Sequence, residues 1–286
     1  MAVPDRVAVK RLIVTADDVG LHRGMTLGAV RAHREGIVTA CSVAAAGREL
    51  EHAADVLSAH PDLDVGVHLM LVGGRPVSDA SRVPSLVTRD GTFAPDHRAF
   101  LARYALGRIS LMEVESELRA QIERLQASGL TPCHLNGHEH LHVLPGIFDI
   151  ITRLAVEYGV PYVRIPDDHA PRRAPSIRRG AIFALGRLAG RARTKARAAG
   201  LRVNDRTIGV ADAGHLTAAR LCRLMRQVSA VTELVTHPGI DGAQIGETYG
   251  WAYDWDAETD ALCDRTVRQA LAGDRIDLIG IRAAVV

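Results

Sequence analysis

Residues 133–159, CHLNGHEHLHVLPGIFDIITRLAVEYG, combine a short strand pattern, a histidine-rich loop and a helix pattern. The apolar residues of 146–159 recur at helical spacing, and the pattern ends at Gly159 as helices commonly do. The segment 133–137 reads as a strand. A strand that leads through a loop into a helix is typical of a parallel sheet, so this stretch favours an α/β fold with functional residues on the loops after the strands.

The same alternation of strand and helix patterns extends over the rest of the chain. Strands are expected at 11–16, 37–45, 64–71, 133–137, 162–166, 232–237 and 276–281, and clear helix patterns lie at 25–36, 111–129 and 146–159. Several strand segments are apolar on both faces, as strands covered by helices are. Because no repeat or linker divides the 286 residues, we expect 1–286 to form one domain.

Composition excludes several classes of protein. Apolar residues make up 47% of the chain, and the net charge of +2 is too small to indicate a nucleic-acid or membrane partner. Cys41, Cys133, Cys222 and Cys263 are far apart and are expected to be buried, reduced thiols. No apolar run has the length of a signal peptide or a membrane span, so we expect a soluble, cytoplasmic protein. Assembly into a homodimer stays open.

The segment 171–202 differs from the rest because it carries nine arginines and one lysine but no acidic residue. We expect a solvated helical insertion here. A nucleic-acid patch is the weaker interpretation, because Phe183 is the only aromatic residue and single-strand binders need a stacking platform. A basic rim that attracts an anionic substrate or partner is a third interpretation that the sequence leaves open.

Polar residues occur at the ends of five expected strands. They are Asp17, Asp18, His68, His138, Arg164 and His237. Alone, an aspartate after a strand is commonly a helix N-cap and a strand histidine is commonly a core residue. Together, these residues should meet at the edge where barrel enzymes keep their sites.

Two imidazoles and a carboxylate are a common set of catalytic metal ligands. Adjacent carboxylates repel each other, and a divalent cation relieves that repulsion. Such a cation acidifies water and polarises a carbonyl group, which suits hydrolysis of an amide or ester.

Four segments of the chain carry a family resemblance. They are LIVTADDVGLHRGMTLGAVRAHREGIVTACSVAAAG (12–47), HPDLDVGVHLMLVGGRPV (60–77), HLNGHEHLHVLPGIFDIITRLAVEYGVPYVRIP (134–166) and THPG (236–239). They resemble the YdjC-like carbohydrate deacetylases, the group that includes chitooligosaccharide deacetylase. The resemblance implies a distorted (β/α) TIM-like barrel, related to the NodB-type polysaccharide deacetylases, that removes acetyl groups from N-acetylated sugars with one divalent metal ion.

The resemblance also implies roles for individual residues. Asp18, His68 and His138 correspond to the metal ligands, and Asp17 corresponds to the catalytic base. The chain departs from the family at Val19, where Phe is common, and at Asn136, where Asp is common. Both departures leave the ligand set intact but put the identity of the substrate in doubt. Imidazole ligands suit Zn²⁺, whereas the resemblance permits Mg²⁺.

Two further roles follow from the chemistry of amide cleavage. The leaving nitrogen must gain a proton as the bond breaks, and His237 is the expected acid, placed by a barrel across the site from the first strand. A strand that ends in a Pro-Gly turn would explain VTHPG without any catalytic role. Arg164 is expected to hold Asp17 in place and keep it ionised.

The histidines of 134–142 differ in their expected positions. On an extended strand His134, Asn136 and His138 share one face, with His138 at the end as ligand and His134 deeper in the core. His140 and His142 should lie in the loop, where His140 is a candidate for substrate contact. Spacing of four on a helix would instead pair His138 with His142 as ligands, and the start of a helix near Pro145 weighs against it.

The expected substrate is a small sugar that contains N-acetylglucosamine, either free or attached to a lipid or another aglycone. Trp251, Tyr253 and Trp255 would form either a sugar-stacking wall or a core strand. Two alternatives remain. One is another metal-dependent amide or phosphoester hydrolase on the same barrel, and the other is a non-catalytic binding protein that uses the basic segment.

Overall fold

The computed structural model describes residues 9–168 and 176–286. Its strands are β1 (Lys10–Val19), β2 (Ala40–Val43), β3 (Asp64–Leu69), β4 (His134–Gly137), β5 (Tyr162–Val163), β6 (Arg206–Ile208), β7 (Val231–Thr236) and β8 (Ile276–Leu278). They form one sheet in the order β5-β4-β3-β2-β1-β7-β6, and β8 pairs with the first residues of β1. Every pair of neighbouring strands is parallel, as the strand–helix alternation predicts.

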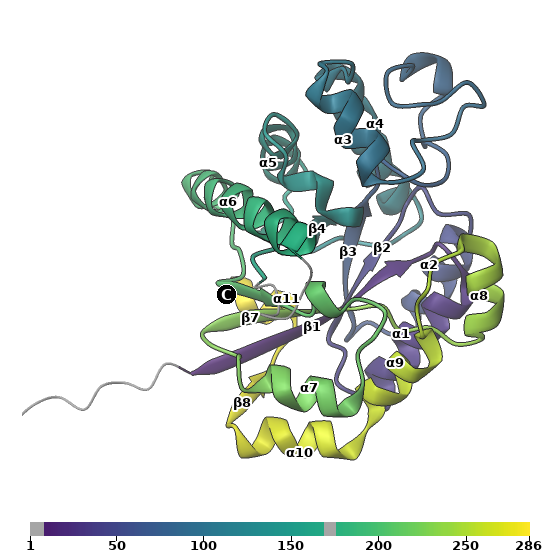
Figure 1. Cartoon of the computed structure of the whole chain (residues 1–286). Helices are drawn as coiled ribbons and strands as arrows, with labels where there is room; N and C mark the ends of the chain where they lie inside the picture. The colour runs from purple at the N-terminus through teal and green to yellow at the C-terminus, as the bar shows by residue number, and fades with distance from the viewer. Residues whose placement is uncertain (1–8, 169–175) are drawn as a thin grey trace, which may run out of the picture.

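Helices lie around the outside of the strands (Figure 1). They are α1 (Arg23–Arg34), α2 (Leu50–Ser58), α3 (His97–Ala105), α4 (Leu111–Ala127), α5 (Ile147–Glu157), α6 (Ser176–Ala198), α7 (Ala218–Met225), α8 (Gly242–Tyr249), α9 (Trp255–Cys263), α10 (Arg265–Gly273) and α11 (Ile281–Val285), with short 3₁₀ segments η1 (Ala80–Arg82), η2 (His138–Val143) and η3 (Val210–Asp212). Helix α4 shows how the sequence specifies them. Ser110 caps its start by accepting a hydrogen bond from the Glu113 N–H, and Val114, Leu118 and Ile122 form a buried stripe.

The sheet curls until its two edge strands meet, and backbone and side-chain hydrogen bonds close the seam. In the backbone, the Val163 N–H donates to the Arg202 carbonyl at 3.0 Å, and the Arg202 N–H donates to the Pro161 carbonyl at 2.8 Å. The Asn204 side chain accepts a hydrogen bond from the Ile165 N–H and donates one to the Ile165 carbonyl, each at 2.8 Å. The Thr207 hydroxyl donates to the same carbonyl at 2.6 Å. These bonds replace the ladder that two longer strands would form. The expected distorted (β/α) barrel is therefore confirmed, and its distortion is concentrated where β5 and β6 have only two and three residues.

The basic segment is helical in its described part. Helix α6 covers Ser176–Ala198, whereas residues 171–175 lie outside the described residues. Ala189, Ala192 and Ala196 are buried at helical spacing, and Arg187 and Arg191 are exposed. Within the described ranges, no helix is both long enough and apolar enough to cross a membrane.

Candidate active site

An irregularity in β1 directs two neighbouring carboxylates to the same site. Side chains alternate between the faces of a regular strand, so Asp17 and Asp18 would point in opposite directions. Instead, the pairing of β1 with β2 shifts between Ala16 and Val19, and Asp18 has a φ of 65°. This is the behaviour of a β-bulge, which re-aims side chains, and Asp is one of the few residues that tolerates the left-handed region. Both aspartates therefore lie inside the extended strand, although the sequence placed them just after it.

The Asp18 carboxylate faces two imidazoles. Asp18 Oδ1 lies 3.1 Å from His68 Nε2 and 2.9 Å from His138 Nδ1, and the two nitrogens are 3.3 Å apart. All three residues are buried. Two ligands that are each about 2.1 Å from one ion lie roughly 3–3.4 Å apart at octahedral or tetrahedral angles. The three residues therefore fit a single divalent cation, and they are the set that the sequence selected.

Asn136 sets the orientation of His68. Its Oδ1 accepts a hydrogen bond from His68 Nδ1 at 2.8 Å, which turns Nε2 toward Asp18. Its Nδ2 donates to Asp17 Oδ1 at 3.1 Å and to Ser42 Oγ at 2.7 Å. An aspartate could accept from His68 but could not donate to Asp17. The asparagine thus connects the two carboxylate environments without adding a charge.

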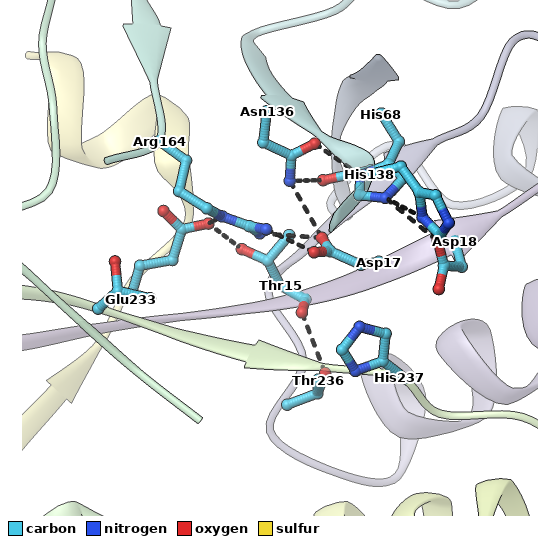
Figure 2. A network of polar contacts seen from close by, with 12 residues as sticks. Thr15, Asp17, Asp18, His68, Asn136, His138, Arg164, Glu233, Thr236 and His237 are labelled. Atoms are coloured by element: carbon cyan, nitrogen blue, oxygen red, sulfur yellow. Dashed lines mark hydrogen bonds and ion pairs between the residues drawn. The ribbon is translucent and has the colours of Figure 1, made fainter. Parts of the chain in front are cut away.

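Asp17 forms a paired ion bridge with Arg164 (Figure 2). Arg164 Nη1 and Nη2 lie 2.5 and 2.9 Å from the two Asp17 oxygens, and both residues are buried. Burial alone would raise the pKa of Asp17, but the charge of Arg164, with smaller effects of His68 and His237, holds it well below its ordinary value. The predicted contact between Arg164 and Asp17 is present, and it favours an ionised Asp17.

Glu233, which sequence reasoning missed, holds the other side of Arg164. Its Oε1 accepts from Arg164 Nε and from the Thr15 hydroxyl, both at 2.8 Å, and its Oε2 accepts from the Tyr162 hydroxyl at 2.9 Å. The signal was a lone acid in the apolar strand TELVT, because a buried carboxylate needs partners.

His237 follows β7, which pairs directly with β1 through the register Ala16↔Thr236. His237 thus follows the strand next to β1, and its expected place across the site from Asp17 and Asp18 stays a prediction. Its imidazole stands apart from the hydrogen-bonded network in Figure 2. Within the described structure Nδ1 has no hydrogen-bond partner, and the ring packs against Tyr253 at 5.4 Å. Burial lowers the pKa of His237, although Asp18 and Asp17 oppose the shift.

The remaining histidines of the opening stretch take separate places. His134 is buried with Nε2 3.0 Å from Ser42 Oγ, as expected for the deeper position. His142 Nε2 donates to the Arg164 carbonyl at 3.0 Å, so the structure groups His138 with His68 and not with His142. Burial lowers the pKa of both His134 and His142 to about 3, so both are neutral. His140 lines the pocket from η2, where it has a φ of 58°.

The candidate ligands, Asp17 and His237 line a pocket of about 780 Å³. Its floor carries Asp17, Asp18, His68, His138 and His237, and its walls are mostly apolar: Leu101, Leu141, Val143, Leu144, Leu185, Leu188, Val210 and Trp251. The Trp251 ring stacks on His138 with centroids 5.6 Å apart. Trp251 and Tyr253 line the pocket, whereas Trp255 is buried in the core. The core-strand interpretation is therefore wrong, because Trp255 begins helix α9, and sugar stacking on Trp251 and Tyr253 stays a prediction.

The chain is similar to a group of known proteins with related names. The model of the family described as YdjC-like protein matches residues 11–273. A carbohydrate deacetylase of Brevibacillus brevis is 42% identical over 156 residues, which cover 54% of this chain and 59% of that protein. A carbohydrate deacetylase of Mus musculus is 31% identical over 300 residues, which cover 95% of this chain and 94% of the relative. The matched region thus spans under two thirds of the bacterial relative's length and nearly all of the mouse protein.

Solved structures show the same fold. A proposed cellobiose-phosphate cleavage protein of Enterococcus faecalis superposes with a TM-score of 0.76 at 25% identity, covering 96% of this chain and 99% of the other. A mutant of a CE4 family pseudoenzyme has a TM-score of 0.50 at 10% identity, covering 97% of this chain and 68% of the other. The second likeness concerns the fold alone.

Proposed function

Since the chain belongs to the family of YdjC-like proteins, we propose that it is a metal-dependent hydrolase that removes acetyl groups from N-acetylated sugars. The names of the relatives, carbohydrate deacetylases, support the reaction and the class of substrate. The observation that carries the proposal is the cluster Asp18, His68 and His138 beside the Asp17–Arg164 pair at the floor of a pocket. The expected cofactor is one divalent cation, Zn²⁺ or Mg²⁺.

The charges of the floor favour a divalent cation. Two of the three buried carboxylates, Asp17 and Glu233, share the guanidinium of Arg164, and the third, Asp18, faces the imidazoles of His68 and His138. Histidines contribute positive charge only when protonated. Uncompensated negative charge is costly in a buried site, and a bound dication would offset it. Two imidazoles in the set suit Zn²⁺ better than Mg²⁺.

The residues divide the work of amide hydrolysis between them. A cation held by Asp18, His68 and His138 would polarise the acetyl carbonyl and acidify the attacking water. Asp17, oriented by Arg164 and Asn136, accepts the proton of that water. His237, on the neighbouring strand, donates a proton to the sugar nitrogen as it leaves. The stacked Trp251 shields one side of His138 from water.

The pocket walls favour a substrate with an apolar aglycone over a free sugar. Leu101, Leu144, Leu185 and Leu188 offer a sugar ring few hydrogen bonds, whereas Trp251 and Tyr253 can stack on its apolar face. A series of alkyl β-N-acetylglucosaminides tests this. KM should fall as the alkyl chain lengthens, and a KM independent of chain length would favour a free saccharide.

A direct test combines metal analysis with acetate release. Protein purified without chelator should contain close to one divalent ion per chain and release acetate from N-acetylglucosaminides. Removal of the ion should abolish release, and its return should restore it. Phosphate release from phosphoesters in place of acetate would support the alternative hydrolase. Binding without turnover of any of these compounds would support a non-catalytic protein.

Location and assembly remain predictions of the same proposal. We expect a cytoplasmic enzyme that does not bind nucleic acid, whose homodimerisation light scattering would decide. The exposed Arg187 and Arg191 of α6 are the part of the basic segment available to an anionic substrate or partner.

A further inference from the structure

Helix α9 grips the loop that carries His237. Glu258 Oε1 accepts a hydrogen bond from the His237 backbone N–H at 2.6 Å. The hydroxyl of the next residue, Thr259, accepts from the Gly239 N–H at 2.9 Å and donates to the Gly239 carbonyl at 2.7 Å. Two consecutive side chains of one helix thus hold both ends of the tripeptide His237-Pro238-Gly239.

The two side chains that hold this loop are buried, and burial of a carboxylate is unfavourable. Glu258 and Thr259 are fully buried, and no ion pair to Glu258 occurs in the described part of the chain. Burial raises the pKa of Glu258 to about 7, while backbone N–H groups oppose the shift. Its other oxygen, Oε2, accepts a hydrogen bond from the Leu216 N–H at 3.4 Å. The buried carboxyl therefore joins the His237 loop to the segment before α7.

Close packing leaves little space around residues 237–239. The loop also lies against α1, where a methyl group on Gly28 would come 2.4 Å from Gly239 Cα. The last paired residue of β7 is Thr236, so the ladder with β1 ends one residue before His237. Beyond that point the backbone is held by α9 and, at Ile240, by a hydrogen bond from its N–H to the Gly24 carbonyl of α1 at 3.0 Å.

The imidazole itself has little else to fix it. Its Nδ1 has no hydrogen-bond partner among the described residues, and its ring packs edge-on against Tyr253 at 5.4 Å. In the other polar residues of the floor, side-chain hydrogen bonds set the orientation. The His237 ring forms no hydrogen bond to residues 9–168 or 176–286, so its orientation depends on the position of its backbone.

We propose that Glu258 and Thr259 are positioning residues that aim the His237 imidazole at the leaving nitrogen by clamping residues 237–239. This inference rests on the proposed function, because it assigns the clamp to proton donation. It predicts that loosening the clamp damages only the step that needs His237.

The main variant is Thr259→Val, which keeps the shape of the side chain and removes both hydrogen bonds to Gly239. Glu258→Gln is the second variant, since it removes the charge and can still accept from His237. Thr248→Val is the matched control, because the Thr248 hydroxyl also donates to a backbone carbonyl, that of Gln244, but on an exposed face of α8. Each variant is assayed on an acetamide substrate and on an activated acetyl ester, whose leaving group needs no proton.

We expect Thr259→Val to lower kcat on the acetamide by about 10–100-fold, the usual cost of a misplaced catalytic group, and to affect the ester far less. Thr259→Ser should restore the acetamide rate. In a His237→Ala background, Thr259→Val should cost nothing further, because both changes remove the same contribution. Equal damage to amide and ester, or full additivity with His237→Ala, would show that the pair supports only the architecture.

Hydrogen exchange provides a readout that needs no catalysis. The amides of His237 and Gly239 should lose protection in Thr259→Val and keep it in Thr248→Val. Unchanged protection in Thr259→Val would overturn the clamp itself. If the wild-type protein released no acetate from any substrate, the proposed function and the catalytic role of the clamp would both fall. The wild-type exchange pattern would distinguish that result from failure of the clamp alone.

Discussion

Asp17 and Asp18 are neighbours in sequence with different partners, and this difference predicts different losses. Asp18 contacts the two imidazoles, whereas Asp17 contacts Arg164 and Asn136. Asp17→Asn should lower kcat by about 10²–10⁴-fold, the usual contribution of a general base, and keep its metal. Asp18→Asn should lower metal occupancy itself. Metal content of the two purified variants decides the matter, and equal loss in both would contradict this division.

His138 and His142 are a second informative pair, because both are buried histidines four residues apart. His138 faces Asp18, whereas His142 donates to the Arg164 carbonyl. His138→Ala and His68→Ala should therefore abolish metal binding and activity, and His142→Ala should retain most of the metal. If His142→Ala lost as much metal as His138→Ala, the alternative in which His138 and His142 are paired ligands on a helix would be supported.

His237 should be needed for amides and nearly dispensable for activated esters. His237→Ala should fold, keep its metal and lose the alkaline limb of the pH–rate profile. In the wild type, that limb should begin below the ordinary histidine pKa of about 6.5, since burial lowers the pKa and the protonated form is lost as pH rises. The measurement is kcat against pH on an acetamide and an activated acetyl ester. Similar losses on both would assign His237 a structural role.

Sequence reasoning found most of the site because its residues end strands that can be recognised locally. Asp17, Asp18, His68, His138, Arg164 and His237 all line or support one pocket. The bulge at Asp17 and Asp18 was not predictable, because it exists only as a shift in pairing with β2. Glu233 was missed for a related reason. Its partners come from β1 and β5, far away in the sequence.

At the level of elements, prediction was good where segments were long. The seven expected strands are present, most of them shorter than expected, and so are the three expected helices. β6 was missed because its residues, RTI, follow the polar Asn204 and Asp205 and show no apolar run, unlike the segments around the comparably short β5 and β8. Its place in the ring is set by pairing with β7 and by the bonds of Asn204 and Thr207 to Ile165, and such contacts leave no local signal.

The hydrogen bonds across the seam between β5 and β6 lead to a prediction about the free energy of unfolding. Asn204→Leu removes both hydrogen bonds to Ile165 and leaves its buried N–H without a partner, whereas the C=O keeps the bond from Thr207, so the change should destabilise the fold by about 1–3 kcal/mol. Asn204→Asp keeps the acceptor for the Ile165 N–H but turns its other oxygen toward the Ile165 carbonyl, so it should also destabilise the fold. Urea unfolding measures both. A change below about 0.5 kcal/mol in Asn204→Leu would show that the barrel does not depend on this seam.

For the whole molecule, Glu258 predicts an unusual dependence of stability on pH. Its pKa is about 7 in the folded protein and 4.5 ordinarily, so the folded state binds more protons between these values. Stability from this group is complete below pH 4.5 and is lost as pH rises toward 7, by an amount on the order of 3 kcal/mol. The buried histidines His134 and His142 act in the opposite direction, because acid charges them when the protein unfolds.

The difference between wild type and Glu258→Gln isolates this contribution. The free energy of unfolding of the variant should gain on that of the wild type as pH rises from 4.5 to 7. Glu247→Gln, a change at an exposed position of α8, is the control and should run parallel to the wild type. Parallel curves for Glu258→Gln and wild type would mean that Glu258 ionises normally in the fold.

The position of α6 has a consequence for how this protein could diversify. Helix α6 lies between β5 and β6 in the sequence, and it supplies Leu185 and Leu188 to the pocket wall. The metal-binding candidates come from β1, β3 and the end of β4. Part of the pocket wall is thus encoded apart from the metal-binding candidates, while Trp251 and Tyr253 line the same pocket. Replacement of residues 176–198 could change which compound the pocket accepts and leave the candidate metal site in place, which makes this segment a suitable target for laboratory evolution.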